Sequence, residues 1–275
     1  MMKLSVAIIT RNEEKNILRC LESVKPVADE IIVVDSLSAD RTAQICNSFG
    51  CRLFQREFDG YGTQKQFAVD NAVNDWILSI DADEVVSEEL GEELAGIFGK
   101  GGHRVTESQT SPSTRPPVHL STCPPVHLFS GYLIPFSLHF MGRIMRHSGV
   151  GNERHLRLFD RTKGGFTKVP VHEGIEIKGD IGTLKGKIVH YSYRDISHHL
   201  DKINVYTSQA AEGYRAKGKS FSKIWVGLKF PVSFFSFYIL KLGFLDGYPG
   251  FMWSFLAAFY ASLKVAKTIE LKDNP

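Results

Sequence analysis

The first hundred residues alternate between short apolar runs and amphipathic helical patterns, and this alternation constrains the fold most strongly. Apolar runs at residues 4–9, 31–34 and 76–80 have the length and β-branched content of buried strands. A helical pattern follows each of the first two runs, and another at residues 64–73 precedes the third. This order predicts an α/β fold in which a mostly parallel, Rossmann-like sheet is flanked by helices.

Three polar residues come directly after the predicted strands. Asn12 follows the first run, Asp35 the second and Asp81 the third. Ligands of open α/β sheets bind beyond the carboxyl ends of the strands. We therefore expect these three residues to lie at the functional edge of the sheet.

The strongest local motif is the acidic segment Ile80-Asp81-Ala82-Asp83-Glu84. Carboxylates two residues apart at a strand end can turn toward one point. Such oxygen ligands suit Mg²⁺ or Mn²⁺ carrying a diphosphate, and the metal would offset charge on a departing nucleoside diphosphate. A solvated turn is the competing interpretation of the Asp-x-Asp pair taken alone.

Polar side chains after the first two strands suggest further ligand contacts. Asp35, at a buried strand end, needs a partner, which a uracil N–H, a ribose hydroxyl or nearby backbone N–H groups would supply. Arg11 is a candidate phosphate partner, and Glu13 could accept a hydrogen bond from a base or ribose. The alternative is that Glu13 only begins a helix and that Asp40 caps the next one.

In their order, spacing and strand context, these motifs resemble glycosyltransferase family 2. The resemblance covers about residues 3–98 and rests on four segments: Val6-Ala7-Ile8-Ile9-Thr10-Arg11-Asn12-Glu13, Ile32-Val33-Val34-Asp35-Ser36, Gln64-Lys65-Gln66-Phe67-Ala68 and Ile80-Asp81-Ala82-Asp83-Glu84. It implies the GT-A fold, a divalent metal and inversion at the anomeric carbon.

The resemblance also implies roles for individual residues. Thr10 and Glu13 would contact the nucleoside and Asp35 the uracil. Asp81 would contact the ribose and Asp83 the metal. The nucleotide-sugar-binding candidates are Thr10, Arg11, Glu13, Asp35, Lys65, Asp81 and Arg157.

Downstream segments are similar to the lipopolysaccharide core glucosyltransferase branch of this family. They are Arg157-Leu158-Phe159-Asp160-Arg161, Val169-Pro170-Val171-His172-Glu173, Ile188-Val189-His190-Tyr191 and Gly243-Phe244-Leu245-Asp246-Gly247. The similarity implies transfer of a hexose, expected to be glucose, from a UDP-sugar to a lipid-linked saccharide.

Inverting transfer needs one carboxylate to deprotonate the acceptor hydroxyl. Glu173 is the candidate, and its alternative role is an exposed acid in a connecting loop. His172 and His190 are candidate ligands of the metal or diphosphate, as neutral imidazole can be. Arg157 would bind phosphate or form a surface salt bridge.

The predicted organisation is a GT-A domain at residues 1–195 and a helical region at 196–275. Residues 99–130 interrupt the first part with Gly, Ser, Thr and Pro and predict a flexible insert. The insert contains Pro-Pro-Val-His-Leu twice. The histidines of the two copies, His119 and His127, are either surface residues without a specific role or metal ligands. Strand patterns between residues 131 and 193 predict a mixed or antiparallel extension of the sheet.

The C-terminal region is aromatic and basic. Residues 214–272 hold nine Lys or Arg residues and only two acidic residues. The whole chain has a net charge of +3, which is too small to indicate a nucleic-acid-binding protein. The uncharged runs of the C-terminal region fall short of the ~20 residues that a spanning helix needs. Interfacial helices on a membrane surface are one interpretation. A deeply inserted hairpin and a helical cap on the sheet are the others.

The N-terminal apolar run is short and followed by charges, which is typical of a strand and not of a signal peptide. The four cysteines show no CxxC spacing, and we expect neither a disulfide framework nor a zinc site. These features predict a cytoplasmic protein that is peripheral on the inner membrane.

Three functional hypotheses remain open on the sequence. The first is a metal-dependent transferase acting on lipid-linked saccharide, with lipopolysaccharide core as the expected acceptor. The second is transfer to polyprenyl phosphate or to a capsular or protein glycan. The third is a non-enzymatic sugar-nucleotide-binding protein, against which the intact acidic residues speak.

Overall fold

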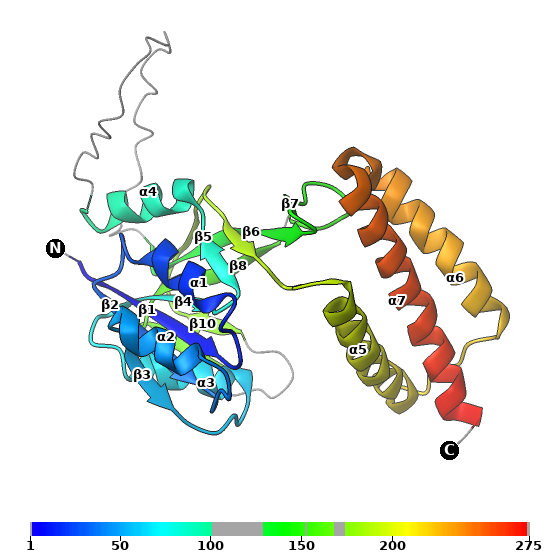
Figure 1. The fold of residues 1–275 in the computed structure, drawn as a ribbon, viewed down its shortest axis with the longest axis horizontal. Coiled ribbons are helices and arrows are strands. Elements are labelled where there is room, and N and C mark those ends of the chain that lie inside the picture. Colours follow the sequence, from blue (N-terminus) through cyan, green and yellow to red (C-terminus); the bar gives the residue numbers. More distant parts are fainter. Residues whose placement is uncertain (1, 101–128, 152, 168–173, 274–275) are drawn as a thin grey trace, which may run out of the picture. The chain divides into compact units, whose positions relative to one another are not determined.

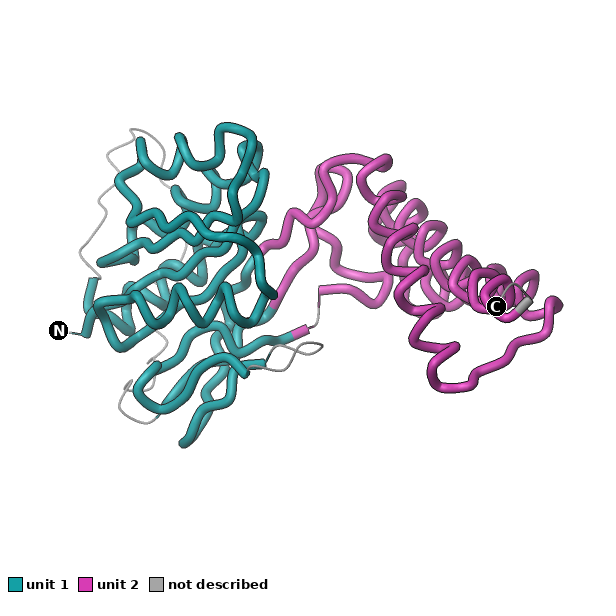
Figure 2. The backbone as a smooth tube through the Cα atoms, turned by 90° about the horizontal axis from the view of Figure 1, so that it is seen from below, with its two compact units in different colours: residues 1–135, 154–188 teal, residues 136–153, 189–275 magenta. Residues whose placement is uncertain are grey.

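A computed structural model of the chain describes residues 2–100, 129–151, 153–167 and 174–273. They form two compact units (Figure 2): residues 1–135 with 154–188, and residues 136–153 with 189–275. The segment 136–153, which the sequence analysis placed in the catalytic domain, is thus grouped with the C-terminal unit. Most of the predicted insert at 99–130 lies outside the described residues.

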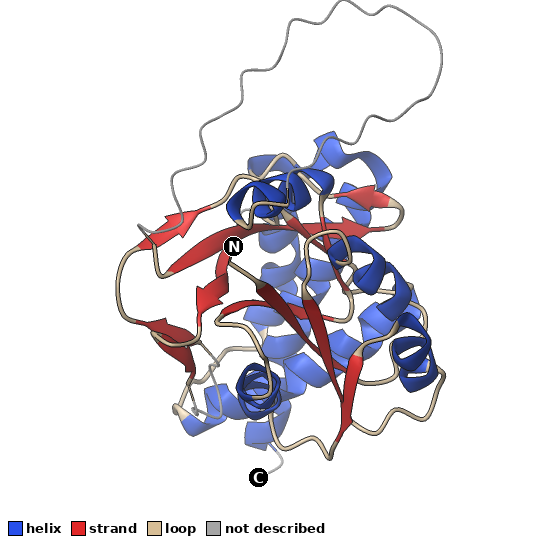
Figure 3. Cartoon of the chain, turned by 90° about the vertical axis from the view of Figure 1, so that its left-hand side faces the viewer, coloured by secondary structure: helices blue, strands red, loops and turns tan. Residues whose placement is uncertain are grey.

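A mixed sheet forms the centre of the first unit (Figures 1 and 3), as predicted. Its parallel part runs in the order β3 (Arg52–Gln55), β2 (Glu30–Asp35), β1 (Leu4–Thr10) and β4 (Trp76–Asp81). The sheet continues with antiparallel β8 (Arg154–Asp160). The expected antiparallel extension is confirmed by this pairing.

The remaining strands extend the sheet or form small additions to it. The order continues from β8 through β6 and β12 to β5, while β11 pairs with β6 in parallel. A separate two-stranded ribbon joins β9 to β10. The bounds are β5 (Glu84–Val86), β6 (Gly131–Phe140), β7 (Arg143–Ile144), β9 (Gly164–Phe166), β10 (Ile175–Ile177), β11 (Ile181–Thr183) and β12 (Ile188–His190).

The helices of the first unit bury most of the apolar positions that the periodicity marks, although Leu18 is 46% exposed. In α1 (Ile17–Val24) the buried residues are Ile17, Cys20, Leu21 and Val24. α2 (Thr42–Phe49) ends at Gly50, which has φ +84°, a backbone conformation that glycine adopts without strain. The other two helices are α3 (Tyr61–Asp70) and α4 (Glu88–Ile97).

α3 covers one face of the parallel sheet. Its Ala68 and Val69 pack into a cluster with Ala7 of β1 and with Ile32 and Val34 of β2. Because side chains alternate between the faces of a strand, Leu4, Val6 and Ile8 of β1, all fully buried, point to the opposite face. The sheet therefore has an apolar core on both sides, which explains why its strands read as continuous apolar runs.

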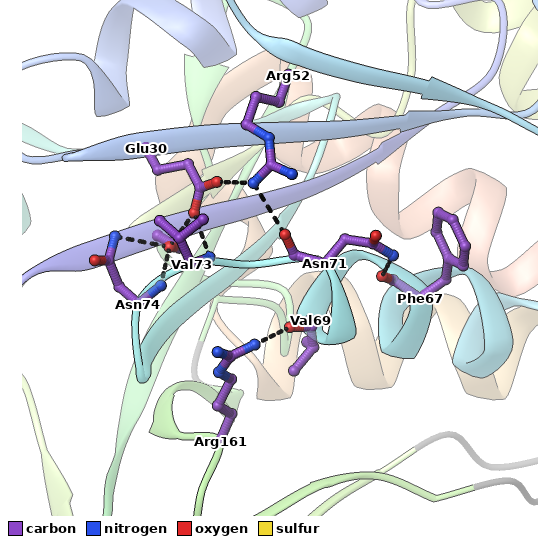
Figure 4. Close-up of polar contacts among 9 residues, drawn as sticks. Glu30, Arg52, Phe67, Val69, Asn71, Val73, Asn74 and Arg161 are labelled. Atoms are coloured by element: carbon purple, nitrogen blue, oxygen red, sulfur yellow. Dashed lines mark hydrogen bonds and ion pairs between the residues drawn. The ribbon is translucent and has the colours of Figure 1, made fainter.

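A polar network ties the amino-terminal edge of the sheet together (Figure 4). Glu30 accepts hydrogen bonds from the Ser5 hydroxyl, from the Val73 amide and from Arg52, which also donates to the Asn71 carbonyl at 3.0 Å. Burial by itself raises the pKa of Glu30, but these hydrogen bonds outweigh burial and lower the pKa. This network fixes the end of the sheet opposite to the candidate site.

The segment before β12 crosses α4 at close range. The amides of Lys185 and Gly186 donate to the Glu93 carboxylate, and Lys187 and Ser87 exchange hydrogen bonds. A Cβ on Gly186 would lie 2.3 Å from the Leu90 backbone nitrogen and Cα. Glycine is required here because of this close approach.

The second unit is mostly helical, as the sequence predicted. It contains α5 (Ile196–Ala216), α6 (Ile224–Phe235), the π-helical turn η2 (Ser236–Leu240), the 3₁₀ turn η3 (Gly243–Asp246) and α7 (Gly247–Asp273). Within this unit α7 lies alongside both α5 and α6 (Figure 1). Phe140, Met145, Ile203 and Leu256 form its apolar core.

The Phe-Leu-Asp-Gly motif has a structural role within this unit. Asp246 is fully buried, and its carboxylate accepts the backbone N–H groups of Arg146 and His147. The His147 ring nitrogen lies 3.2 Å from the same carboxylate. Buried charge requires such compensation, so Asp246 anchors the 145–148 loop to the start of α7.

Replacing Gly186 with alanine should destabilise the protein, because the new methyl group meets the α4 backbone. Overpacking of this kind costs about 1–3 kcal/mol, and each kcal/mol lowers the melting temperature by about 2–4 °C. Gly96→Ala is the matched control: a Cβ there meets nothing within 4 Å inside α4, so alanine should stabilise the protein by about 0.5–1 kcal/mol. Equal melting temperatures for the two variants would contradict the close approach.

Candidate active site

The carboxyl ends of three neighbouring strands bring the predicted polar residues to one edge. In the parallel register Thr10 lies opposite Asp35, and Ile9 lies opposite Asp81. Thr10, Asp35 and Asp81 therefore lie at the ends of β1, β2 and β4. This register confirms the predicted position of Asp35 and Asp81 at one edge of the sheet, and the third predicted residue, Asn12, follows the end of β1 by two positions.

Asp81 lies between two cationic side chains. Its carboxylate is 3.2 Å from the Lys65 Nζ and 3.6 Å from the Arg157 Nη2. The Lys65 side chain is only 6% exposed and that of Arg157 only 13%. Both cations were predicted to bind the nucleotide sugar, and here both neutralise the carboxylate expected to contact the ribose.

Glu84 holds the acidic turn in shape. It is 1% exposed, accepts the Asp81 amide at 2.8 Å and pairs with Arg157 at 2.8 Å. Arg157 thus bridges Glu84 and Asp81 from β8. Glu84 was not predicted as a site residue, although its place as the third acid of the motif was the available signal.

The acidic turn packs on α1 through Cys20. The Cys20 thiol lies 3.6 Å from the Asp81 carbonyl oxygen. Burial, followed by the charges of Glu84, Asp83 and Asp81, raises the pKa of Cys20 well above its usual value. The thiol therefore stays protonated and acts as a small apolar support beneath three carboxylates.

Asp83 occupies the turn between β4 and β5 and is half-buried. Among the residues described, no group of three or more His, Cys, Asp or Glu side chains is placed to hold a metal ion. Mg²⁺ is commonly bound by one or two carboxylates together with substrate phosphates and water. The carboxylates at this turn are compatible with that mode, in which Asp83 would be the protein ligand.

Asp35 is fully buried at the end of β2. It accepts hydrogen bonds from the Ser38 amide and hydroxyl and from the Gln55 amide group at 3.1 Å. The chain itself thus supplies part of the partner set that a strand-end carboxylate needs. These donors hold the carboxylate at the sheet edge in one orientation.

Two buried polar atoms near Asp35 have no hydrogen-bond partner among the described residues. They are the Thr10 hydroxyl and the Gln64 side-chain carbonyl. Gln64 is anchored through its amide nitrogen, which donates to the Ser36 hydroxyl at 2.9 Å. Buried polar atoms are nearly always paired, so both atoms are candidate partners for ligand groups. Gln64 was part of the family motif but was not predicted as a site residue.

The segment after β1 is locked to the segment after β2. Asn12 has φ +54°, and it exchanges hydrogen bonds with Ser38 and Ala39. Asp40 accepts the amides of Glu14 and Thr42. Burial pushes the pKa of Asp40 up, but hydrogen bonds from Thr42 and Glu14 outweigh it and lower the pKa.

The remaining candidates differ in their surroundings. Arg11 is exposed, and Glu13 is half-buried and accepts from the Asn16 amide at 2.7 Å. His172 and Glu173 lie outside the described residues. His190 is the half-buried last residue of β12 and belongs to the second unit. The roles predicted for these residues stay predictions.

Known proteins resemble the chain over most of its length. An uncharacterised glycosyltransferase of Rickettsia typhi is 30% identical over 98% of this chain and 88% of its own. The lipopolysaccharide core biosynthesis glycosyltransferase LpsC of Rhizobium meliloti is 28% identical over 100% of this chain and 96% of its own.

One solved structure and one family model add to these relatives. The Staphylococcus aureus TarS fragment 1–349 in complex with UDP has a TM-score of 0.36 and 23% identity, over 54% of this chain and 39% of that one. The model described as "Glycosyl transferase family 2" matches residues 5–116, which include the acidic turn and both preceding strand ends. Together with the full-length relatives, this match shows that the chain belongs to glycosyltransferase family 2.

Proposed function

We propose that this glycosyltransferase moves a hexose, with glucose the first choice, from a UDP-sugar to a lipid-linked saccharide, with inversion at the anomeric carbon. The acidic turn carries the proposal: Asp81 is held by Lys65 and Arg157, and Asp83 stands two residues further along the same turn. Full-length similarity to a lipopolysaccharide core glycosyltransferase supports lipopolysaccharide core as the acceptor.

A divalent cation held by Asp83 would supply positive charge to the departing diphosphate. Lys65 and Arg157 cancel the charge of Asp81, so this carboxylate can sit near a ribose without repelling the diphosphate. Thr10 and Gln64 offer unpartnered buried oxygens to the nucleoside. Asp35, fixed by Ser38 and Gln55, is oriented to accept from the base.

The acceptor hydroxyl must lose its proton as the new bond forms. Glu173, in the Val-His-Glu segment, is our candidate for that base. His172 and His190 are proposed to approach the metal or diphosphate, and Arg157 to keep its place beside the acidic turn. Transfer to polyprenyl phosphate or to another glycan would use the same donor side and differ only in the acceptor.

We also propose that the second unit docks on the cytoplasmic face of a membrane. No residue of α6, which is described throughout, is fully buried, and its Ile224, Trp225 and Val232 are 71%, 54% and 63% exposed. No single helix in the described parts of the chain is long and apolar enough to cross a membrane. The pair Ile224–Leu240 and Gly243–Lys272, bent by 69°, passes that test only jointly, by length and composition.

Asp83→Ala should remove metal-dependent turnover and leave the fold intact. Loss of charge stabilisation at a leaving group typically costs about 10²-fold or more in rate. The measurement is release of UDP and of glycosylated lipid-core acceptor across a Mn²⁺ titration, with the melting temperature as a check on folding. Asp201→Ala, which removes an exposed acid of α5, is the control and should keep full activity. Wild-type activity in Asp83→Ala would contradict the assignment of Asp83 as the metal ligand.

Glu173→Gln should bind UDP-sugar normally and transfer it slowly, because the amide keeps the shape and cannot take a proton. Removing a general base costs about 10²–10⁴-fold in rate. Single-turnover transfer and donor binding are measured side by side. Glu176→Gln, an exposed acid three residues along in β10, should transfer at the wild-type rate. A loss below tenfold in Glu173→Gln would place the base elsewhere.

The double variant Val232→Ser with Leu240→Ser should weaken binding to anionic liposomes, because both side chains are more than 60% exposed on the apolar helices. Flotation measures the bound fraction, and Leu18→Ser with Val73→Ser, two exposed apolar positions of the first unit, should float like wild type. High salt should release the protein only in part, since apolar burial is not screened.

Alkaline carbonate washing separates surface docking from insertion. We expect the wash to release the protein. Retention after carbonate would favour an inserted hairpin of the bent pair, and failure of the wild-type protein to float would reject membrane docking.

A further inference from the structure

The second unit contains a pocket that lies within its own helices and includes none of the residues of the candidate active site. Residues of α5, α6, η2 and α7 enclose about 460 Å³, which lies within the range of about 300–1,000 Å³ typical of small-molecule sites. Aromatic side chains dominate its walls, among them Tyr193, Tyr206, Phe237, Trp253 and Tyr260. All of them belong to one compact unit, so the pocket does not depend on the first unit.

The lining is positively charged. Lys202, Lys229 and Lys264 line the pocket, and no Asp or Glu is among the described residues that do so. The Lys202 ammonium group donates to the Ser192 carbonyl at 2.8 Å and lies 5.4 Å from the ring centroid of Tyr193, another lining residue. Apolar walls combined with three ammonium groups suit a ligand with an apolar body and an anionic head.

Two buried polar atoms in the lining have no hydrogen-bond partner among the described residues. They are the His199 Nδ1 and the Trp253 indole Nε1. His199 is only 5% exposed, and its ring stacks on Tyr193 with 3.8 Å between centroids. An unpaired buried polar atom is costly, and ligand oxygens would provide the missing partners.

The imidazole is neutral in this environment. Burial, followed by the charges of Lys202 and His198, lowers the pKa of His199 to about 4. Burial likewise raises the pKa of Tyr193 to about 12. Neither side chain carries charge near neutral pH. The lysines therefore provide the electrostatic attraction for an anion, and the imidazole and the indole provide specific hydrogen bonds.

We propose that this pocket binds a single-chain lipid anion, with its alkyl chain against the aromatic walls and its phosphate among Lys202, Lys229 and Lys264. His199 and Trp253 give hydrogen bonds to the oxygens at the head of that lipid. This is a discrete site with one occupant, separate from the exposed apolar face of α6. It holds whether or not the chain performs the proposed transfer.

Binding of decyl phosphate below its micelle concentration tests the proposal. Isothermal titration calorimetry on the full chain should show saturable binding with one site. Octyl phosphate should bind roughly tenfold or more weakly, because each methylene contributes about fourfold in affinity (0.8 kcal/mol). Inorganic phosphate and octanol, which each carry one half of the chemistry, should both bind far more weakly. Non-saturable uptake, or equal affinity for octyl and decyl phosphate, would overturn the proposal.

Matched variants locate the site. Ala257→Phe places a ring in the pocket lining and should reduce decyl phosphate affinity at least tenfold, whereas Ala216→Phe, at an exposed position in the last turn of α5, should not. Lys229→Gln should weaken binding several-fold, and Lys217→Gln, with the same loss of charge outside the lining, should leave it unchanged. Equal losses in both lysine variants would show general charge attraction and overturn the site. The lysine pair decides if Ala257→Phe fails to fold.

Discussion

The buried contact between Arg157 and Glu84 holds the acidic turn on which the candidate active site depends. One guanidinium group, 13% exposed, holds a carboxylate that is 1% exposed and reaches Asp81 as well. Breaking such a pair by removing one partner is strongly destabilising, because an uncompensated charge remains buried. Lys65 completes the set from α3, so two cations balance Asp81 and Glu84. Asp83 then supplies the additional negative charge of the turn, which is the charge that the proposed cation-bound diphosphate would use.

Much of this arrangement follows from the sequence, because it depends on local pattern. Buried parallel strands read as unbroken apolar runs, and their carboxyl ends must meet at one edge. The alternation of strands and helices was therefore enough to predict that Asp35 and Asp81 lie at the same edge of the sheet. The cap at Gly50 and the helical C-terminal region follow from equally local signals. The family of the enzyme was readable for the same reason, since its motifs sit at these strand ends.

The partners of these residues were not predictable, because they come from far along the chain. Arg157 meets Glu84 across 73 residues, and nothing in the local pattern distinguishes this ion pair from phosphate binding. The sequence likewise gave little indication of the roles of Gln64 and Asp246. Gln64 is an amide side chain in a predicted helix, and Asp246 is an acidic residue in an aromatic segment. Periodicity shows which face of a helix is apolar, but it does not show whether a protein core, a lipid or solvent covers that face. The pocket around His199 was missed for this reason.

The two units present surfaces of different chemistry, and the proposed reaction needs both. The sheet edge of the first unit gathers buried carboxylates, cations and unpartnered oxygens, which suit a charged, water-soluble nucleotide sugar. The second unit presents exposed aromatic residues, a lysine-lined pocket and a basic excess, which suit an amphiphile. A soluble donor and a lipid-linked acceptor differ in just this way. An enzyme that joins them must desolvate phosphates in one place while tolerating a lipid in another. In the proposed function, the polar network of the first unit therefore serves the nucleotide sugar and the apolar, basic surface of the second serves the lipid.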